Sequence, residues 1–112
     1  MKILTILVND KVVHEIDREQ ELADEQLAFL DNMDGSMDGG IKLYGELIPK
    51  PDHEQRARFV AMNLLKALQQ ENEAIISASG AYLVNRYPGL SEVHAKDEVN
   101  RVVIDLVEEA LN

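Results

Sequence analysis

The sequence predicts an α+β protein in which a small antiparallel β-sheet packs on three to four helices. Two clusters of β-branched residues, one within residues 3–16 and one within residues 99–107, predict strands at both ends of the chain. Between them, apolar residues recur at helical spacing in segments separated by glycine, proline and polar breaks. With 112 residues, 46% of them hydrophobic, the chain can form the core of one domain, so we expect residues 1–112 to fold as a single domain.

The amino-terminal residues predict a β-hairpin. Residues 3–8 are β-rich, residues 9–11 (Asn-Asp-Lys) have turn chemistry, and residues 12–16 resume with β-branched side chains. The first apolar run is too short for a signal peptide and lacks a small-residue cleavage site, so we interpret it as a strand. Because two strands alone are marginally stable, we expect helices or another strand to cover this hairpin.

A first helix is predicted after the hairpin. Asp17 followed by Gln20 forms a candidate N-terminal cap pair, and Asp24 is a second candidate start further along the chain. The apolar residues at helical spacing are Leu22, Ala23, Leu27, Leu30 and Met33. We expect this helix to fray into the glycine-containing segment 35–40.

An alternative is that the first helix continues to about Asp38. Asp31, Asp34 and Asp38 would then lie on one face, and Met33 and Met37 on another. An acidic stripe beside a flexible apolar edge suits a partner that carries basic and apolar groups.

The second helix has the clearest start in the chain. Residues 41–44 predict a short extended segment, and the glycine and prolines that follow exclude a continuous helix. Directly after Pro51, Asp52 and Gln55 have the spacing of a capping box. A broad apolar arc follows, made of Ala57, Val60, Ala61, Leu64, Leu65 and Leu68.

A third helix is predicted over residues 73–86, with Asn72 as its cap and residues 87–89 (Tyr-Pro-Gly) as its end. One face carries small residues, which let another helix or strand approach closely. These are Ala74, Ser77, Ala78 and Ala81, beside Gly80. Because the break between the second and third helices is short, we expect them to pack as an antiparallel pair.

Residues 92–111 fit two structures. As a helix, the segment would be capped by Asp97 and would bury one apolar face. That face consists of Val99, Val102, Val103, Leu106, Val107, Ala110 and Leu111. As a hairpin, residues 92–95 and 101–107 would pair across a turn near residues 97–100. We favour the hairpin, because the segment is rich in β-branched residues and the amino-terminal hairpin needs strands to pair with.

Composition excludes several classes of function. The formal net charge of −10 comes from 21 acidic and 11 basic residues, and such a surface repels nucleic acid and anionic membranes. The chain has no cysteine, which excludes disulfides, thiolate chemistry and iron–sulfur clusters. Its apolar runs are shorter than the roughly 18 residues of a membrane span. We therefore expect a cytoplasmic protein that binds neither nucleic acid nor membranes.

One segment resembles a calcium-binding loop and departs from it near its end. Asp34, Ser36 and Asp38 occupy loop positions one, three and five, and the required glycine follows at position six. Position twelve, which needs a bidentate glutamate, is a glycine, and Glu46 comes one residue later. The sequence therefore gives Asp34, Ser36, Asp38 and Glu46 as candidate ligands of calcium or magnesium, and it indicates no other cofactor.

Catalytic patterns are absent from the sequence. No serine lies in a nucleophile elbow, and no glycine-rich phosphate loop is present. The three histidines, His14, His53 and His94, are scattered along the chain, and no two have the spacing of a helical metal site. A site assembled from one of them and a carboxylate would need the fold to bring distant segments together.

These observations favour a small acidic binding or accessory module that is non-catalytic and associates with itself, as a homodimer for example, or with another protein. Phe29, Met33 and Met37 are the candidate interaction residues, because they would form an apolar patch beside acidic side chains. The alternatives are a divalent-cation-binding protein that uses the loop from Asp34 to Glu46, and a small enzyme with a histidine–carboxylate site.

Overall fold

The computed structural model describes residues 2–99 and 101–109, and within them the chain has mixed α and β content. The strands of the larger sheet are β1 (Ile3–Val8), β2 (Lys11–Asp17), β5 (Leu90–Glu98) and β6 (Arg101–Glu108). The helices are α1 (Asp24–Asp38), α2 (His53–Gln70) and α3 (Glu73–Arg86). A separate two-stranded sheet consists of β3 (Ile41–Leu43) and β4 (Glu46–Ile48). The α+β class predicted from the sequence is confirmed, with three helices in the described residues.

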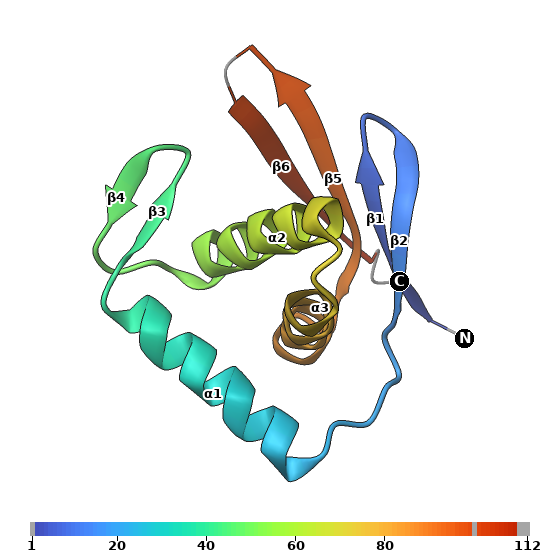
Figure 1. Cartoon of the computed structure of the whole chain (residues 1–112), viewed down its shortest axis with the longest axis vertical. Coiled ribbons are helices and arrows are strands. Elements are labelled where there is room, and N and C mark those ends of the chain that lie inside the picture. The colour runs from blue at the N-terminus through green and yellow to red at the C-terminus, as the bar shows by residue number, and fades with distance from the viewer. Residues whose placement is uncertain (1, 100, 110–112) are drawn as a thin grey trace.

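The larger sheet has the strand order β2-β1-β5-β6, and its helices lie on one side (Figure 1). Helices α2 and α3 are next to the sheet, and α1 lies beyond them. The β3–β4 hairpin stands at the far end of α2 from α3 (Figure 1). None of the helices in the described part of the chain is both long enough and apolar enough to cross a lipid bilayer.

The prediction of a purely antiparallel sheet is wrong at its centre, where β1 and β5 are parallel. The β1–β2 and β5–β6 pairs are antiparallel, as hairpins require. Strand β2 covers one edge of β1, and the chain then passes through all three helices before it returns to the other edge. A return of this kind is a crossover connection, which allows the incoming strand to run parallel to β1.

The N-terminal hairpin is confirmed, and its turn uses left-handed backbone conformations. Asn9 and Asp10 have φ angles of 51° and 68°, as the two central residues of a type I′ turn require. The C-terminal hairpin is confirmed over residues 90–108, so the alternative helix does not form there. Three positions of that prediction, Asn100, Ala110 and Leu111, lie outside the described residues.

The predicted start of the first helix at Asp17 is wrong. The helix begins later, at Asp24 as the second prediction has it, but Ala23 and not Asp24 occupies the cap position. The Asp17 carboxylate instead accepts a hydrogen bond from the Glu19 N–H at 2.8 Å, which forms a local turn. At the true start, the Gln26 side chain accepts from the Ala23 N–H at 2.9 Å. The helix runs without interruption to Asp38, as the alternative interpretation of this segment predicts.

The caps predicted for the other two helices are confirmed. Asp52 accepts from the Gln55 N–H at 2.8 Å, and the Gln55 side chain accepts from the Asp52 N–H at 2.9 Å, which is a complete capping box. Asn72 accepts from the Ile75 N–H at 3.3 Å and begins α3.

The small-residue face of α3 allows the close approach that its sequence predicts. A Cβ atom on Gly80 would lie 3.1 Å from Cδ1 of Ile16, which comes from β2. The core between sheet and helices includes the fully buried side chains of Leu4, Ile6, Leu64, Leu83, Val93 and Ile104. Gly80 therefore sets the distance between α3 and the β2 edge of the sheet.

Candidate functional site

An open apolar groove of about 490 Å³ lies between α2 and the larger sheet. Its lining is Val8, Val13, Met62, Leu65, Lys66, Leu68, Gln69, Ala95, Asp97 and Val102. Seven of these ten side chains are apolar, and the volume lies within the range of ligand sites in proteins. The groove is therefore the described surface that is best suited to take an apolar group.

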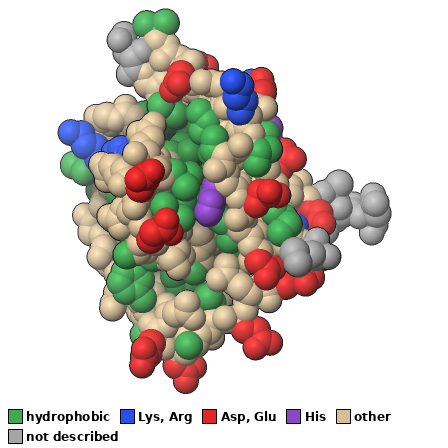
Figure 2. Space-filling model, turned by 45° about the vertical axis from the view of Figure 1, so that its right-hand side comes forward, with side chains coloured by type: hydrophobic (Ala, Val, Ile, Leu, Met, Phe, Trp, Pro, Cys, Tyr) green, Lys and Arg blue, Asp and Glu red, His purple; other side chains and the backbone are tan. Residues whose placement is uncertain are grey.

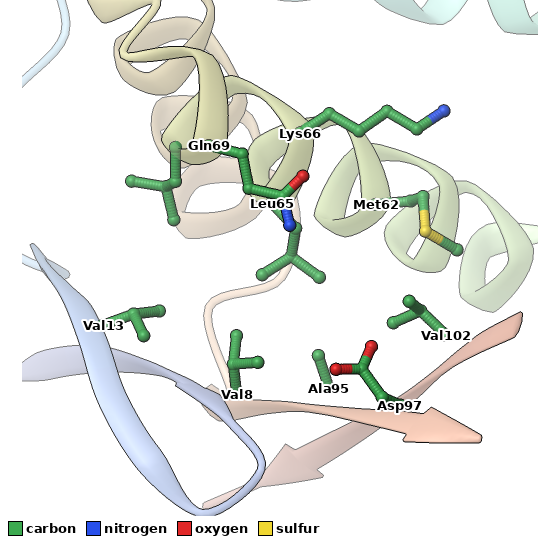
Figure 3. Close-up of a pocket in the computed structure, with 10 residues that line it drawn as sticks. Val8, Val13, Met62, Leu65, Lys66, Gln69, Ala95, Asp97 and Val102 are labelled. Atoms are coloured by element: carbon green, nitrogen blue, oxygen red, sulfur yellow. The ribbon is translucent and has the colours of Figure 1, made fainter. Parts of the chain in front are cut away.

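The groove follows from the lengths of the elements around it. The tips of the β1–β2 and β5–β6 hairpins extend beyond α2, so this part of the sheet has no helix over it (Figure 1). Alternation along the strands turns Val8, Ala95 and Val102 toward the helical side. Helix α2 contributes Leu65 from the opposite wall (Figure 3). The sheet thus presents apolar side chains that the helical layer leaves partly uncovered.

Figure 3 shows how the polar lining residues lie. The Gln69 amide points from α2 toward the sheet, and the Asp97 carboxylate points from β5 into the groove. The Lys66 ammonium points along α2, away from the groove, so only its aliphatic stem contributes to the lining. The groove therefore presents a carboxylate to an occupant, among apolar walls.

The position of Asp97 is fixed by Asn9 in the neighbouring hairpin. The Asn9 side-chain amide donates to Asp97 Oδ2 at 3.1 Å, and the Asp97 N–H donates to Asn9 Oδ1 at 3.0 Å. The Asn9 N–H donates in turn to the Ala95 carbonyl at 2.8 Å. These bonds tie the two hairpin ends together and hold the carboxylate in place at the mouth of the groove.

The candidate metal ligand Asp34 lies elsewhere, where the three helices meet. Tyr82 from α3 donates its hydroxyl hydrogen to Asp34 Oδ1, and Arg86 Nε donates to Asp34 Oδ2 at 3.1 Å. Arg56 from α2 donates to Asp34 Oδ1 at 3.4 Å and to its backbone carbonyl at 3.3 Å. Both carboxylate oxygens therefore have protein donors, and Asp34 joins α1 to α2 and α3.

The same two arginines bind the acidic residues one turn away on each side. Arg86 Nη2 lies 2.7 Å from Asp31 Oδ1, and Arg56 Nη2 lies 2.6 Å from Asp38 Oδ1. The acidic stripe that the sequence predicts along this helix thus exists, and basic residues of the protein itself neutralise it.

The electrostatics of this cluster favour an ionised Asp34 and a neutral Tyr82. Burial by itself raises the pKa of Asp34, but hydrogen bonds from Tyr82, Arg86 and Arg56 outweigh it and hold the pKa below its ordinary value. Burial, together with the hydrogen bond to Asp34, raises the pKa of the Tyr82 hydroxyl. The phenol therefore stays protonated and acts as a donor, which suits a structural clamp between helices.

Two candidate metal ligands, Ser36 and Glu46, do not contact Asp34 or its arginine partners. Ser36 is exposed on α1, and Glu46 is exposed on β4. In the described portions of the chain, no three acidic or histidine side chains come close enough together to hold a metal ion.

The three candidate interaction residues have different surroundings. Phe29 is 53% exposed, and it lines a hollow of about 450 Å³ together with Met33, Ala74 and Ile75, between α1 and the pair α2–α3. Met37 is only 3% exposed and belongs to the core. The structure therefore brings Phe29 and Met33 to one surface hollow and keeps Met37 away from it.

The histidines lie in three separate places. His14 lines a hollow between β2 and α3, and the His53 ring lies against Tyr87 with ring centroids 4.1 Å apart. His94 Nε2 is 2.6 Å from a Glu92 oxygen, and both residues are on β5. The fold does not assemble the three histidines into one site.

The chain matches no protein-family model, and comparison with curated proteins and with solved structures also found no match.

No pattern in the sequence indicates the groove. The sequence predicts strands at Val8 and Val102 and a turn or helix cap at Asp97. The interaction that positions Asp97 joins residues 88 positions apart in the chain, and no local pattern marks such a pairing. The one available signal is the length of the two hairpins, since each hairpin continues beyond its last buried strand position.

Proposed function

We propose that the protein is a non-catalytic binding module that holds a short segment of a partner protein in the groove between α2 and the sheet. The observation that carries the proposal is the combination of an apolar lining with the Asp97 carboxylate, which points into the cavity. Such a site favours a segment in which apolar side chains stand next to a lysine or arginine.

The charge of the whole molecule supports a basic partner. The formal net charge is −10, which attracts basic segments over distances of about a Debye length, roughly 8–10 Å in physiological salt. Figure 2 shows one face on which hydrophobic side chains gather in the upper middle, with acidic side chains around them. Attraction of this kind speeds association, and apolar contact then stabilises the complex.

The apolar walls and the Asp97 carboxylate are expected to contribute different amounts to the binding free energy. Burial of one valine- or leucine-sized side chain contributes about 1.5–3 kcal/mol, so the apolar walls supply most of the affinity. Asp97 is exposed, and an exposed ion pair contributes about 0.2–1 kcal/mol, which changes the affinity by a factor of about 1.4 to 5. The carboxylate therefore acts mainly on selectivity and on salt dependence.

We also propose that the module associates with itself and works as one domain in the cytoplasm, as its composition predicts.

The test is fluorescence anisotropy with a labelled amphipathic peptide whose leucines lie on one helical face and whose lysines flank it. Val102→Asp places a charge in the groove, and we expect it to weaken binding by roughly tenfold or more. Val103→Asp is the matched control, because Val103 is the adjacent residue on β6, is similarly half-buried, and does not line the groove.

Asp97→Asn should weaken peptide binding by up to about fivefold and reduce its dependence on salt. A peptide with serine in place of leucine should lose binding. If both peptides bind equally well, or if Val102→Asp and Val103→Asp have the same effect, the groove is not the binding site. Circular dichroism of each variant confirms that it folds.

A further inference from the structure

The groove crosses all four strands of the larger sheet. Figure 3 shows Val13 of β2 and Val102 of β6 at its two ends, with Val8 of β1 and Ala95 of β5 between them. Neighbouring strands lie about 4.8 Å apart, so the three spacings give the groove a length of about 14 Å. Helix α2 also runs across the strands (Figure 1). A segment that fills the groove therefore lies alongside α2.

Helix α2 presents one of its faces to the groove. Met62, Leu65, Lys66 and Gln69 line it with the i, i+3, i+4, i+7 spacing of a single helical face. Helix α3 packs against α2, and in Figure 1 it lies on the opposite side of α2 from the hairpin tips. The groove is thus the next position in the helical layer, with a helical face as one wall and a sheet as the other.

Neither wall offers backbone hydrogen bonds to an occupant. The backbone N–H and C=O groups of strands lie in the plane of the sheet, and Val8 and Ala95 each lie between two neighbouring strands. The backbone of α2 is bonded within the helix. An extended segment would therefore leave backbone groups unpaired against apolar side chains, and each such group weakens binding roughly fivefold or more.

A helical segment avoids this loss. Its backbone groups bond to one another, so it meets the apolar walls with side chains alone. At a rise of 1.5 Å per residue, a length of about 14 Å corresponds to a helix of about nine residues. Apolar side chains three and four residues apart on such a helix face the groove together.

The Asp97 carboxylate indicates where a basic side chain of the helix lies. Asp97 Oδ2 accepts from the Asn9 side chain at 3.1 Å, and within the described part of the chain no donor bonds to Asp97 Oδ1. One oxygen of the carboxylate is therefore open to an ammonium group. A lysine beside the apolar face of the helix has the length and the charge to reach it.

We propose that the occupant of the groove is an amphipathic helix of about nine residues in a partner protein, which packs beside α2 and places a lysine at Asp97. This inference rests on the proposed function, which gives the apolar and basic character of the segment but not its conformation. A helix of this length is marginal in water, so the segment becomes helical as it binds.

The test is fluorescence anisotropy of the full chain with two labelled peptides that share their leucines and lysines. Three positions that face solvent in the helix are alanine in one peptide and threonine in the other. Threonine disfavours helix and favours extended chain, so we expect the threonine peptide to bind roughly 10- to 30-fold more weakly. A peptide with the same three exchanges placed beyond the nine-residue segment is the matched control and should bind as the alanine peptide does.

The Cα chemical shifts of a carbon-13-labelled alanine peptide provide the second readout, and on binding they should move to helical values. If Val102→Asp weakens binding but the threonine peptide binds as tightly as the alanine peptide or more so, or if the bound peptide has extended Cα shifts, the helix is overturned and the proposed function stands. If the alanine peptide does not bind, or binds equally well to the Val102→Asp variant, both proposals fail.

Discussion

Replacing Asp34 with asparagine removes the negative charge at the point where the three helices meet. The carboxylate accepts hydrogen bonds from Tyr82, Arg86 and Arg56, and the side chain is 31% exposed. Asparagine keeps the shape, but its amide group places donors against the arginine donors. The variant therefore separates the contribution of charge from that of packing.

The expected cost follows from those contacts. A hydrogen bond to a charged group contributes about 1.5–3 kcal/mol, and the partial exposure of Asp34 reduces its value through solvent screening. We expect Asp34→Asn to lower the free energy of unfolding by about 2–3 kcal/mol. Asp31→Asn and Asp38→Asn serve as matched controls, because they touch the same arginines but are 77% and 67% exposed. Each should cost less than about 1 kcal/mol.

The pH dependence provides a second, independent readout. The pKa of Asp34 is lowered in the folded protein, so its stabilising contribution is fully present above the unfolded-state pKa, about 3.9, and is lost as the pH falls through the folded-state value. The stability difference between wild type and Asp34→Asn should therefore be constant between about pH 5 and 7 and should shrink below about pH 4.

Urea unfolding followed by circular dichroism measures all of these quantities, since the chain contains no tryptophan for fluorescence. Equal stability of the three asparagine variants would show that Asp34 contributes no more than its exposed neighbours. A difference caused by Asp34→Asn that persists unchanged in acid would show that the charge is not its source.

Three further outcomes are expected. Gly80→Ala should be neutral or destabilising in the wild type, because the new Cβ lies 3.1 Å from Ile16 Cδ1, but it should stabilise an Ile16→Val background by roughly 0.5–1 kcal/mol. Urea unfolding of the wild type, the two single variants and the double variant measures both effects, and equal effects in the two backgrounds would contradict the prediction. Tyr44→Phe removes the hydroxyl that accepts from the Ile104 N–H, so it should cost about 1–2 kcal/mol and speed hydrogen exchange at that amide; an unchanged exchange rate would show that the bond does not protect the amide. Millimolar calcium should leave the melting temperature unchanged, because the Asp34 oxygens have protein donors; a rise that Asp34→Asn abolishes would instead favour the cation-binding alternative.

The elements that could be predicted from the sequence are those with local signals. The Asp52–Gln55 capping box operates within three residues, and the type I′ turn at Asn9 depends on two adjacent residues. Local signals can also mislead. Asp17 has the chemistry of a helix cap, but the same side chain can close a loop turn, and here it bonds to the Glu19 N–H.

The features that could not be predicted depend on distant partners. Asp34 has the spacing of a calcium-loop ligand, but Arg56 and Arg86 reach it from 22 and 52 residues away. The helix therefore continues past Gly35 to Asp38, and the acidic residues become ion-pair partners of the two arginines. The groove is also non-local, because it depends on how far two hairpins extend beyond a helix.

The central claim is that the groove between α2 and the sheet holds an apolar and basic segment, and methyl NMR of the wild-type chain tests it most directly. On titration with the lysine-flanked leucine peptide, we predict that the methyl signals of Val8, Leu65 and Val102 shift together and saturate with a single dissociation constant. Shifts that centre on Phe29 and Met33, or that spread evenly over the acidic surface, would contradict the account.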